Sequence, residues 1–437
     1  MVKQNFPDLR LSGLREVVHR ELESAGFAER LGSGAQIAIG AGSRGIANIA
    51  LIVKSAVEFF AAKGYWPWVF PAMGSHGGAT AEGQRDVLAR YGIDESTMGC
   101  PVVSQMDTVP TGKTPSGIET FADQAAMRSD GILLINRVKW HTSFQGAVES
   151  GVTKMAAIGL GKIDGARACH RHARSLGMEK VIREAAQQNL ATGKLIGGLA
   201  ILEDANHRTA RISALRAENL IAGEEELFAL VKSWMGRIPV PALDLLILDE
   251  IGKDISGTGM DTKVVNRGVL GQYNPWPGIP RIERIYLRDL SAATHGNAVG
   301  IGMADAIHDR LLAKVDPEPT WVNAVTSGSL AAVRTPIHYG SDKKCIEMLA
   351  QTVGKADISE VTIAWIRNSL ELGRLAMSEN LRQRIEENPA LEIEGPPFEL
   401  DFDPQGNLPV RQDGICGCIA PGSSGASRDT VTLPIQR

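Results

Sequence analysis

The order in which apolar runs and helical patterns alternate constrains the fold more than any other feature of this sequence. Short apolar runs alternate with segments in which apolar residues recur about every 3.6 positions, which predicts parallel strands covered by helices. In the first half of the chain, buried strands are predicted at 35–42, 65–74, 130–138 and 194–204. Helices are predicted at 46–64 and 80–92, after a short polar strand and an amphipathic helix within 1–26. The first half is therefore expected to form an α/β domain.

A second series of elements follows a segment that contains Pro239 and Pro241. Proline is typical of a boundary, and a chain of 437 residues is longer than one hydrophobic core usually serves. We therefore expect two α/β domains, 1–237 and 238–437, with mostly parallel sheets, an active-site cleft between them and a flexible C-terminal tail. Around and after the boundary the predicted elements are a helix at 223–236, strands at 244–252 and 282–290, and a helix at 300–315.

Composition and charge restrict the class of function. The net charge of −4 and a pI near 6.2 argue against a nucleic-acid-binding protein and against a membrane-surface protein. No apolar run approaches the roughly 18 residues that a membrane span requires, and the N-terminus lacks a signal-peptide core. Five cysteines fit reduced thiols better than a disulfide framework. We expect a cytoplasmic enzyme that acts on a small molecule, and the oligomeric state, including a homo-oligomer, stays open.

The densest reactive chemistry lies in the run 136–175. It places the amine of Lys154, the imidazoles of His141 and His170 and the thiol of Cys169 among many small residues. Imidazole carries protons and binds borderline metals, and a lysine among small residues can be a covalent anchor or a phosphate contact. The residue types alone also fit ordinary helix and loop. Because His172 lies two residues after His170, a helix would direct only one of the two into a site.

Two glycine-rich turns follow the first two predicted strands. The segment 40–45 has the form GxGxxG, and its Arg44 suits a carboxylate or a phosphate. A dinucleotide site also expects an acidic residue at the end of the second strand, and 65–74 contains none. That strand is instead followed by His76 among glycines, at the edge where open α/β sheets bind ligands. The segment 159–162 does not satisfy the phosphate-loop pattern of P-loop NTPases.

The second half offers further polar loops at predicted strand ends. The loop 250–261 is rich in polar residues and glycine, and Lys253 or the later Arg267 is expected to reach across the cleft to the substrate. His295 lies in another polar loop, for which a site element and a structural turn are both open. The pair Cys416 and Cys418 is a weak metal motif and is expected to be inert.

The sixteen-residue spacing from Lys154 to His170, with Gly151 just before the lysine, resembles that of the lactate racemase-like family. These are 2-hydroxyacid racemases and epimerases that depend on a nickel-pincer nucleotide (nickel pyridinium-3,5-bisthiocarboxylic acid mononucleotide). The resemblance implies that Lys154 carries this cofactor through a thioamide bond and that His170 ligates the nickel. It also implies a supply of the cofactor by dedicated synthesis enzymes.

The same resemblance implies the remaining roles. His76 and His141 resemble the two acid/base histidines, which act on opposite faces of a planar intermediate. Arg44 resembles an arginine that contacts the cofactor and the substrate carboxylate. In the second half, Lys253, Arg267 and His295 are the candidates for further substrate contacts.

The sequence also departs from the family pattern. Thirteen residues separate His141 from Lys154, more than in the lactate racemases, and Ala41 stands where those enzymes have an aspartate. Ser43 replaces a threonine, and Val265 stands where a substrate-binding tyrosine is expected. The resemblance is therefore to a divergent member, whose substrate can be a larger or sugar acid.

The expected reaction is inversion at C2 of a 2-hydroxy acid by hydride transfer. Two alternatives remain open at this point: an NAD-dependent oxidoreductase that uses the 40–45 turn, and a non-catalytic protein that binds a metal or a metabolite.

Overall fold

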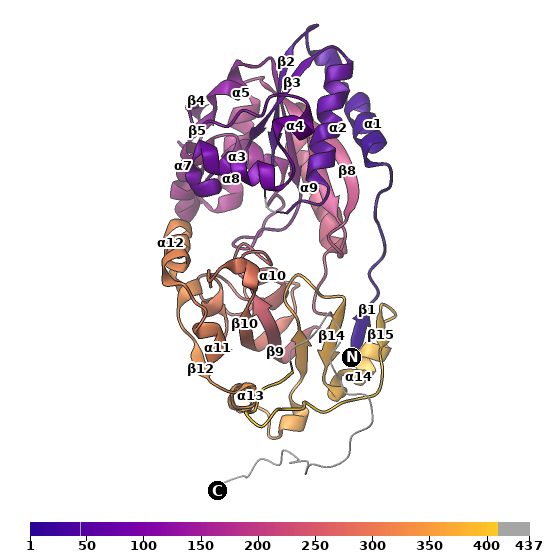
Figure 1. Ribbon diagram of the computed structural model, residues 1–437, viewed down its shortest axis with the longest axis vertical. Helices are drawn as coiled ribbons and strands as arrows, with labels where there is room; N and C mark the ends of the chain where they lie inside the picture. Colours follow the sequence, from indigo (N-terminus) through magenta and orange to yellow (C-terminus); the bar gives the residue numbers. More distant parts are fainter. Residues whose placement is uncertain (44, 410–437) are drawn as a thin grey trace.

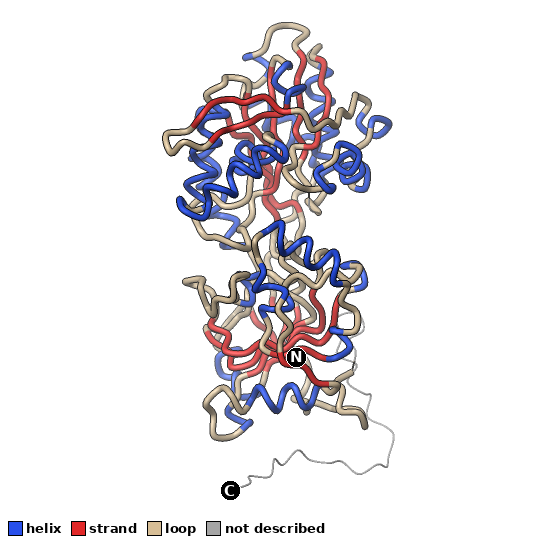
Figure 2. Tube along the Cα trace, turned by 90° about the vertical axis from the view of Figure 1, so that its left-hand side faces the viewer, coloured by secondary structure: helices blue, strands red, loops and turns tan. Residues whose placement is uncertain are grey.

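The computed structural model describes residues 1–43 and 45–409, so Arg44 and the pair Cys416 and Cys418 lie outside the described residues. Two lobes lie one above the other along the long axis of the molecule (Figure 1). The strands form two separate groups, one in each lobe, with helices around them (Figure 2). Both large sheets are mostly parallel, which confirms the α/β prediction.

The N-terminal lobe contains a five-stranded sheet in the order β3-β2-β6-β7-β8. The first four strands are parallel, and β8 pairs with β7 in the antiparallel direction. All four strands predicted in this half are present. The strand bounds are β2 Gln36–Ala41, β3 Trp66–Pro71, β6 Gly131–Arg137, β7 Leu195–Glu203 and β8 Thr209–Arg216, with a separate hairpin of β4 Thr108–Lys113 and β5 Glu119–Asp123.

The helices of this lobe include every helix predicted there. The hydroxyl of Thr80 accepts a hydrogen bond from the Gly83 amide and so fixes the start of α3. A π-helix, η3 (Met155–Gly159), directly follows the short helix α6. The helix bounds are α1 Leu14–Ser24, α2 Ile49–Ala62, α3 Ala81–Arg90, α4 Glu95–Met98, α5 Gln124–Arg128, α6 Val152–Lys154, α7 Lys162–Leu176, α8 Met178–Leu190 and α9 Leu220–Trp234.

The C-terminal lobe contains an eight-stranded sheet in the order β12-β11-β10-β9-β13-β14-β1-β15. Strands β9 to β13 are parallel, and both strands predicted at 244–252 and 282–290 are present as β9 and β10. The strand bounds are β9 Ala242–Ile251, β10 Arg281–Leu290, β11 Ala306–His308, β12 Ile337–Tyr339, β13 Ile363–Ile366, β14 Arg374–Met377 and β15 Leu391–Ile393. The helix bounds are α10 Thr262–Val265, α11 Asp309–Leu312, α12 Pro317–Ser327, α13 Asp342–Ala350 and α14 Arg382–Glu386.

The first strand of the chain belongs to this second sheet. Strand β1 (Val2–Gln4) pairs with β14 and β15, and Figure 1 shows it in the lower lobe, away from α1. The proposed N-terminal domain 1–237 therefore contributes one strand to the sheet of the other lobe. A pairing between segments so far apart in sequence leaves no local pattern in the residues themselves.

The prediction of one helix at 300–315 is wrong. Gly300, with a φ of 110°, precedes a 3-10 helix of only three residues (η6, Ile301–Met303), and the short strand β11 then interrupts the predicted helix. Strand β11 pairs with β10 and β12, and the His308 side chain then accepts the Arg310 amide at 2.9 Å to start α11. The hydrogen bonds of β11 to its neighbouring strands stabilise an extended backbone more than the helical spacing of apolar residues at 300–315 favours a helix.

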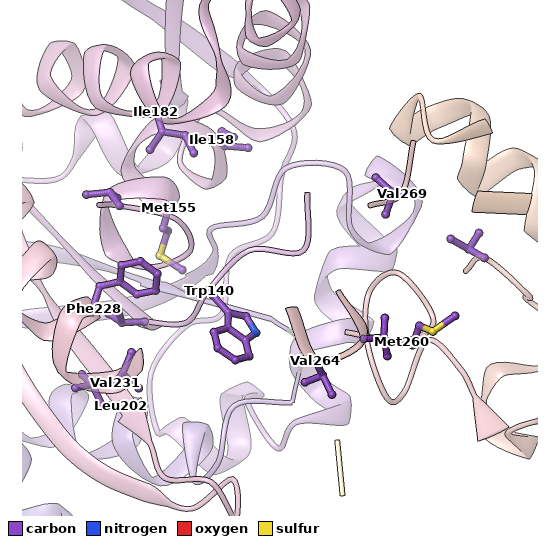
Figure 3. Close-up of a cluster of buried hydrophobic side chains, with 14 of the residues drawn as sticks. Trp140, Met155, Ile158, Ile182, Leu202, Phe228, Val231, Met260, Val264 and Val269 are labelled. Atoms are coloured by element: carbon purple, nitrogen blue, oxygen red, sulfur yellow. The ribbon is translucent and has the colours of Figure 1, made fainter. Parts of the chain in front are cut away.

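One hydrophobic cluster runs through the junction of the lobes. Trp140 lies between Phe228 and Val231 of the upper lobe and Val264 of the lower lobe (Figure 3). Trp140 is only 4% exposed, so the lobes share apolar core and not just surface contacts. In the part of the chain that the structure describes, no helix has the length and apolar character needed to cross a membrane.

Candidate active site

The loops that follow the parallel strands of the upper lobe pack against the segment that carries Lys154. A Cβ added to Gly42, after β2, would lie 3.1 Å from the Met155 Cε. A Cβ added to Gly74, after β3, would lie 3.1 Å from the Ala166 Cβ. Glycine at both loops therefore permits a close approach to η3 and α7, so the ends of β2 and β3 pack against the segment that follows Lys154.

Lys154 is half-buried at the end of the short helix α6. Gly151 precedes this helix, and a Cβ there would lie 2.5 Å from the Glu224 carboxyl group. The Thr153 amide donates to Glu224 Oε2 at 2.9 Å, and Asn136 Nδ2 donates to the Gly151 carbonyl at 2.8 Å. The backbone that presents Lys154 is thus held from β6 and from α9.

Glu224 is a buried carboxyl group that the sequence analysis did not single out. Burial raises its pKa to about 7, although the hydrogen bond from Thr153 favours the charged form. A signal was present in the sequence, because Glu224 shares one helical face with Leu220, Phe228 and Val231. A carboxylate on an apolar face of a helix indicates a specific partner inside the fold.

The structure brings His170 close to Lys154. His170 lies at the exposed edge of α7, where partial desolvation and then the positive charge of Lys154 lower its pKa. Cys169 points instead into the core, and burial raises the pKa of its thiol to about 12. The charge of Lys154 therefore acts on the imidazole of His170, whereas the thiol of Cys169 faces the core.

His76 lies in the loop after β3, beside the loop that carries Arg44. Its Nδ1 is hydrogen-bonded to the Ser43 hydroxyl. Gly77 has a φ of 60°, and a Cβ there would lie 2.3 Å from the Gly83 backbone, so the tight turn after His76 requires glycine. Gln84 Nε2 donates to the carbonyls of residues 73 and 74, at 3.1 Å in each case, and so holds the loop in place.

Two side chains at the ends of β6 and β7 hold the segment of Gly45 and Ala47 in place. The Arg137 guanidinium donates to the Gly45 carbonyl at 3.3 Å and pairs with Glu203 at 2.6 Å. The other oxygen of Glu203 accepts the Ala47 amide at 2.8 Å. The turn is therefore anchored to the ends of β6 and β7.

His141 lies in the loop after β6 and is half-buried. Its amide donates to Glu149 Oε2 at 2.5 Å, and its Nδ1 lies 3.1 Å from the Ser143 amide and 3.0 Å from the Ser143 hydroxyl. The ring also packs against Phe144, with 4.6 Å between centroids. These contacts fix the orientation of the imidazole.

Residues of the lower lobe bind the loop that carries His141. Lys263 Nζ, from α10, donates to Glu149 Oε2 at 2.5 Å and to the Phe144 carbonyl at 2.9 Å. The Thr262 hydroxyl donates to the Thr142 carbonyl at 2.6 Å. Burial raises the pKa of Glu149 and lowers that of Lys263, and the attraction between the two opposes both shifts. The position of His141 therefore depends on both lobes, through residues that the sequence analysis missed.

The candidates of the lower lobe are engaged within that lobe. Lys253 donates to the Asn323 side chain at 2.7 Å and to the Gly257 carbonyl at 2.5 Å. Arg267 is 2% exposed and donates to the carbonyls of residues 282 and 283 at 2.6 and 2.8 Å. His295 is exposed on a turn with a φ of 50°. The structure thus places Arg267 in the interior of the lobe, away from the histidines and Lys154.

The glycines of the GxGxxG turn are explained by packing within the upper lobe. A Cβ on Gly40 would lie 2.7 Å from Leu134 Cδ2, and a Cβ on Gly42 would lie 2.4 Å from Asn136 Oδ1. These two glycines admit neighbouring side chains of the same sheet, which weakens the interpretation as a dinucleotide turn. Among the residues that the structure describes, no group of three or more His, Cys, Asp or Glu side chains is placed to hold a metal ion.

Comparisons with known proteins identify the fold. No protein-family model and no curated protein matches the chain. The structure of the lactate racemase apoprotein from Thermoanaerobacterium thermosaccharolyticum matches 84% of this chain and 95% of its own length, with a TM-score of 0.51 and 13% sequence identity. A crystal structure of a Thermotoga maritima protein covers 65% of this chain and 71% of its own, with a TM-score of 0.48 and 14% identity. The first match shows that this chain has a lactate racemase-like fold.

Proposed function

We propose that this chain, which has a lactate racemase-like fold, is an isomerase that inverts C2 of a 2-hydroxy acid. Two observations support the proposal. The loops of His76 and His141 follow β3 and β6, which are parallel to the β2 strand between them, so both loops leave the same edge of the upper sheet. The positive charge of Lys154 also acts on His170. The departures around Ala41 and Val265 favour a larger or sugar acid over lactate as the substrate.

The residues present fit a nickel-pincer nucleotide. Lys154 lies at the end of the short helix α6, whose backbone is held by Glu224, and its charge acts on His170. The glycines at 45 and 78 leave the turns beside this region without side chains that would obstruct a bound group. Lys154 would hold the group through a thioamide bond, and His170 would ligate the nickel. When bound, the group would supply the hydride acceptor for C2. Dedicated synthesis enzymes are its proposed source.

The two histidines would transfer the proton of the C2 hydroxyl group. Inversion presents the C2 hydroxyl from two directions, so a base is needed on each side. His76, oriented by Ser43, would take or return the proton on one side. His141, oriented by Glu149 and Ser143, would do so on the other.

Charged side chains would bind the acid. Arg44 is the proposed partner of the carboxylate, because a guanidinium can bind it with two parallel hydrogen bonds. Lys253 and His295 are the candidates for contacts from the lower lobe. We leave Arg267 out of the proposed site, since its guanidinium is buried against carbonyls of its own lobe.

The test uses protein coexpressed with the cofactor-making enzymes and incubated separately with each stereoisomer of a panel of 2-hydroxy acids. Chiral chromatography should show conversion of one isomer into the other for at least one acid. Bound nickel without any interconversion would favour the binding-protein alternative. A saturable change in nicotinamide fluorescence on titration of NADH would favour the oxidoreductase.

A further inference from the structure

A fully buried lysine lies between two segments that carry proposed site residues. Lys162 is 0% exposed and stands midway in the sequence between Lys154 and His170. An ammonium has three donors and no acceptor, and its burial is costly unless other groups pair with it. Its partners must therefore come from the protein itself, and a phosphate or a substrate cannot reach it.

Groups from three different elements surround the Lys162 ammonium. Its Nζ donates to the Pro71 carbonyl, at the end of β3, at 2.6 Å and to Gln84 Oε1, on α3, at 3.2 Å. It also forms an ion pair with Asp123 Oδ2, at the end of β5, at 3.3 Å. The other oxygen of Asp123 accepts a hydrogen bond from Gln105 Nε2 at 2.8 Å. Burial lowers the pKa of Lys162, and the charge of Asp123 opposes this shift.

Lys162 also determines which way the Gln84 amide points. Gln84 is fully buried, and the two ends of its amide have nearly the same shape but opposite hydrogen-bonding roles. Because an ammonium can only donate, Oε1 faces Lys162. Nε2 then faces three carbonyls of the loop after β3, those of Met73, Gly74 and His76, at 3.1, 3.1 and 3.4 Å. The buried ammonium therefore fixes the donor that holds the loop of His76.

The backbone at Lys162 is strained. Its φ of 50° lies in the left-handed region, which favours glycine over a residue with a Cβ. Such a conformation persists where surrounding contacts fix it. A Cβ on Gly74 would lie 3.7 Å from the Lys162 carbonyl oxygen and 3.1 Å from the Ala166 Cβ. Both the side chain and the backbone of Lys162 therefore lie against the loop that carries His76.

The loop of His141 has a different support. Glu149 and Ser143 contact His141, and Lys263 of the lower lobe holds Glu149. A change at Lys162 should therefore reach one of the two proposed bases and not the other.

We propose that Lys162 is a positioning residue for His76, which acts through Gln84 and holds the imidazole in place beside the segment of Lys154. This role rests on the proposed function, because it takes His76 as one of two bases.

The first test measures the imidazoles of the purified full-length chain and does not depend on any reaction of the protein. Diethyl pyrocarbonate modifies neutral imidazoles, and peptide mass spectrometry gives the rate at each histidine. Lys162→Met and Gln84→Met should each raise the rate at His76 about tenfold, which corresponds to the loss of one hydrogen bond to a charged group. The rate at His141 should stay unchanged.

A double variant and a matched control sharpen this measurement. The double variant Lys162→Met/Gln84→Met should react at His76 like each single variant, because both changes remove the same support. Lys194→Met removes a half-buried lysine that donates to the Ser129 carbonyl at 2.9 Å, just before β7 begins, and should change neither rate.

Three results would overturn the role of Lys162. These are an unchanged rate at His76 in Lys162→Met, an equal rise at both histidines, and effects of the two single changes that multiply in the double variant. Thermal unfolding checks that each variant is folded. Lys162→Gln, which keeps one donor, replaces Lys162→Met if the methionine variant does not fold.

The second test uses cofactor-loaded protein and single-turnover kinetics. In Lys162→Met, reduction of the cofactor should slow about 100-fold for the stereoisomer that depends on His76, the scale of a misplacement of roughly 1 Å. Reduction by the other stereoisomer should stay unchanged, whereas a general loss of structure would slow both. Racemisation with both half-reactions unaffected overturns the role of Lys162 alone. A selective response of His76 to the reagent, in a protein that racemises no acid, supports the positioning of this loop and overturns the proposed function.

Discussion

Individual buried charges, Asp342 in the lower lobe and Glu224 and Lys139 in the upper lobe, are compensated to different degrees. In the lower lobe, Asp342 accepts hydrogen bonds from Tyr286, from Arg288 at 3.0 Å and from Arg310 at 2.6 Å, and these partners lower its pKa to about 2. In the upper lobe, the pKa of Glu224 is raised and the pKa of Lys139 is lowered, in both cases because burial is only partly compensated. Compensated charge indicates a structural role, whereas uncompensated charge near a cleft is typical of sites.

This difference suggests that the upper lobe carries the reactive side chains and that the lower lobe holds them in position. The proposed bases, His76 and His141, lie on loops of the upper lobe, and Lys263 of the lower lobe holds the loop of His141. The predictions below test this division, from the largest expected effect to the smallest.

The largest effect is expected at the proposed anchor. Lys154→Ala should abolish both racemisation and the mass adduct of protein coexpressed with the cofactor-making enzymes, because no other amine can form the thioamide at that position. Intact-mass spectrometry and chiral chromatography measure the two effects. Lys180→Ala, which changes an exposed lysine paired with Glu184 on α8, is the control. An adduct that persists in Lys154→Ala would rule out this anchor.

Each histidine should affect racemisation in both directions at steady state, but only one of the two half-reactions. His76→Ala and His141→Ala should each lower kcat/KM by roughly 10²–10⁴, the usual share of positioned acid–base catalysis, and equally in both directions. In single-turnover experiments, reduction of the cofactor by one isomer should survive each change while reduction by the other is lost. If His76→Ala reacts with both isomers at the unmodified rate, the two-base arrangement is wrong.

A change in the charge network of the lower lobe should lower the stability of the protein more than its rate of catalysis. Asp342→Asn leaves the buried Arg288 without its full counter-charge, so we expect the free energy of unfolding to fall by about 3–5 kcal/mol. Chemical denaturation measures this change. The kcat of the fraction that remains folded should stay unchanged, and a large loss of kcat would contradict the structural role assigned to this network.

Glu224 predicts a pH dependence of stability in the upper lobe. Its folded-state pKa of about 7 lies above the ordinary 4.5, so the folded protein keeps a proton that the unfolded chain releases between these values. The free energy of unfolding should therefore fall as the pH rises from 4.5 to 7, by at most about 3 kcal/mol, and level off above. Glu224→Gln should lack this slope, and Glu226→Gln, at an exposed position of the same helix, should retain it. Parallel slopes for all three proteins would disprove the assignment.

The smallest effect is expected at the proposed nickel ligand. His170→Ala should weaken nickel retention about 10- to 100-fold, because a lost ligand is not replaced from another face of the helix. His172→Ala should leave the nickel content nearly unchanged. Metal analysis after dialysis compares the two variants, and the reverse order would show that His172 is the ligand.

Much of the fold could be predicted, because many of its elements have a pattern within their own residues. Strands β2 and β7, for example, are recognised because the buried residues of each strand form one short run of mostly apolar residues. The helix predicted at 300–315 failed because β11 is stabilised by strands on either side of it, and a three-residue strand has no periodicity of its own. The placement of β1 in the lower sheet was missed for the same reason.

The sequence by itself determined the α/β class and most of the strands and helices that it predicted, and its spacing suggested the pair of Lys154 and His170, which remains a proposal. Only the tertiary structure decided what holds these groups. Lys263 meets Glu149 across 114 positions of the chain, and Glu224 meets Thr153 across 71. It also decided that Arg267 lies inside its lobe and that Lys139 faces the junction. The spacing of residues along the chain indicates which side chains share one face of a helix or strand. The burial of a charged side chain, and the partner that compensates its charge, depend on segments that meet only when the chain has folded.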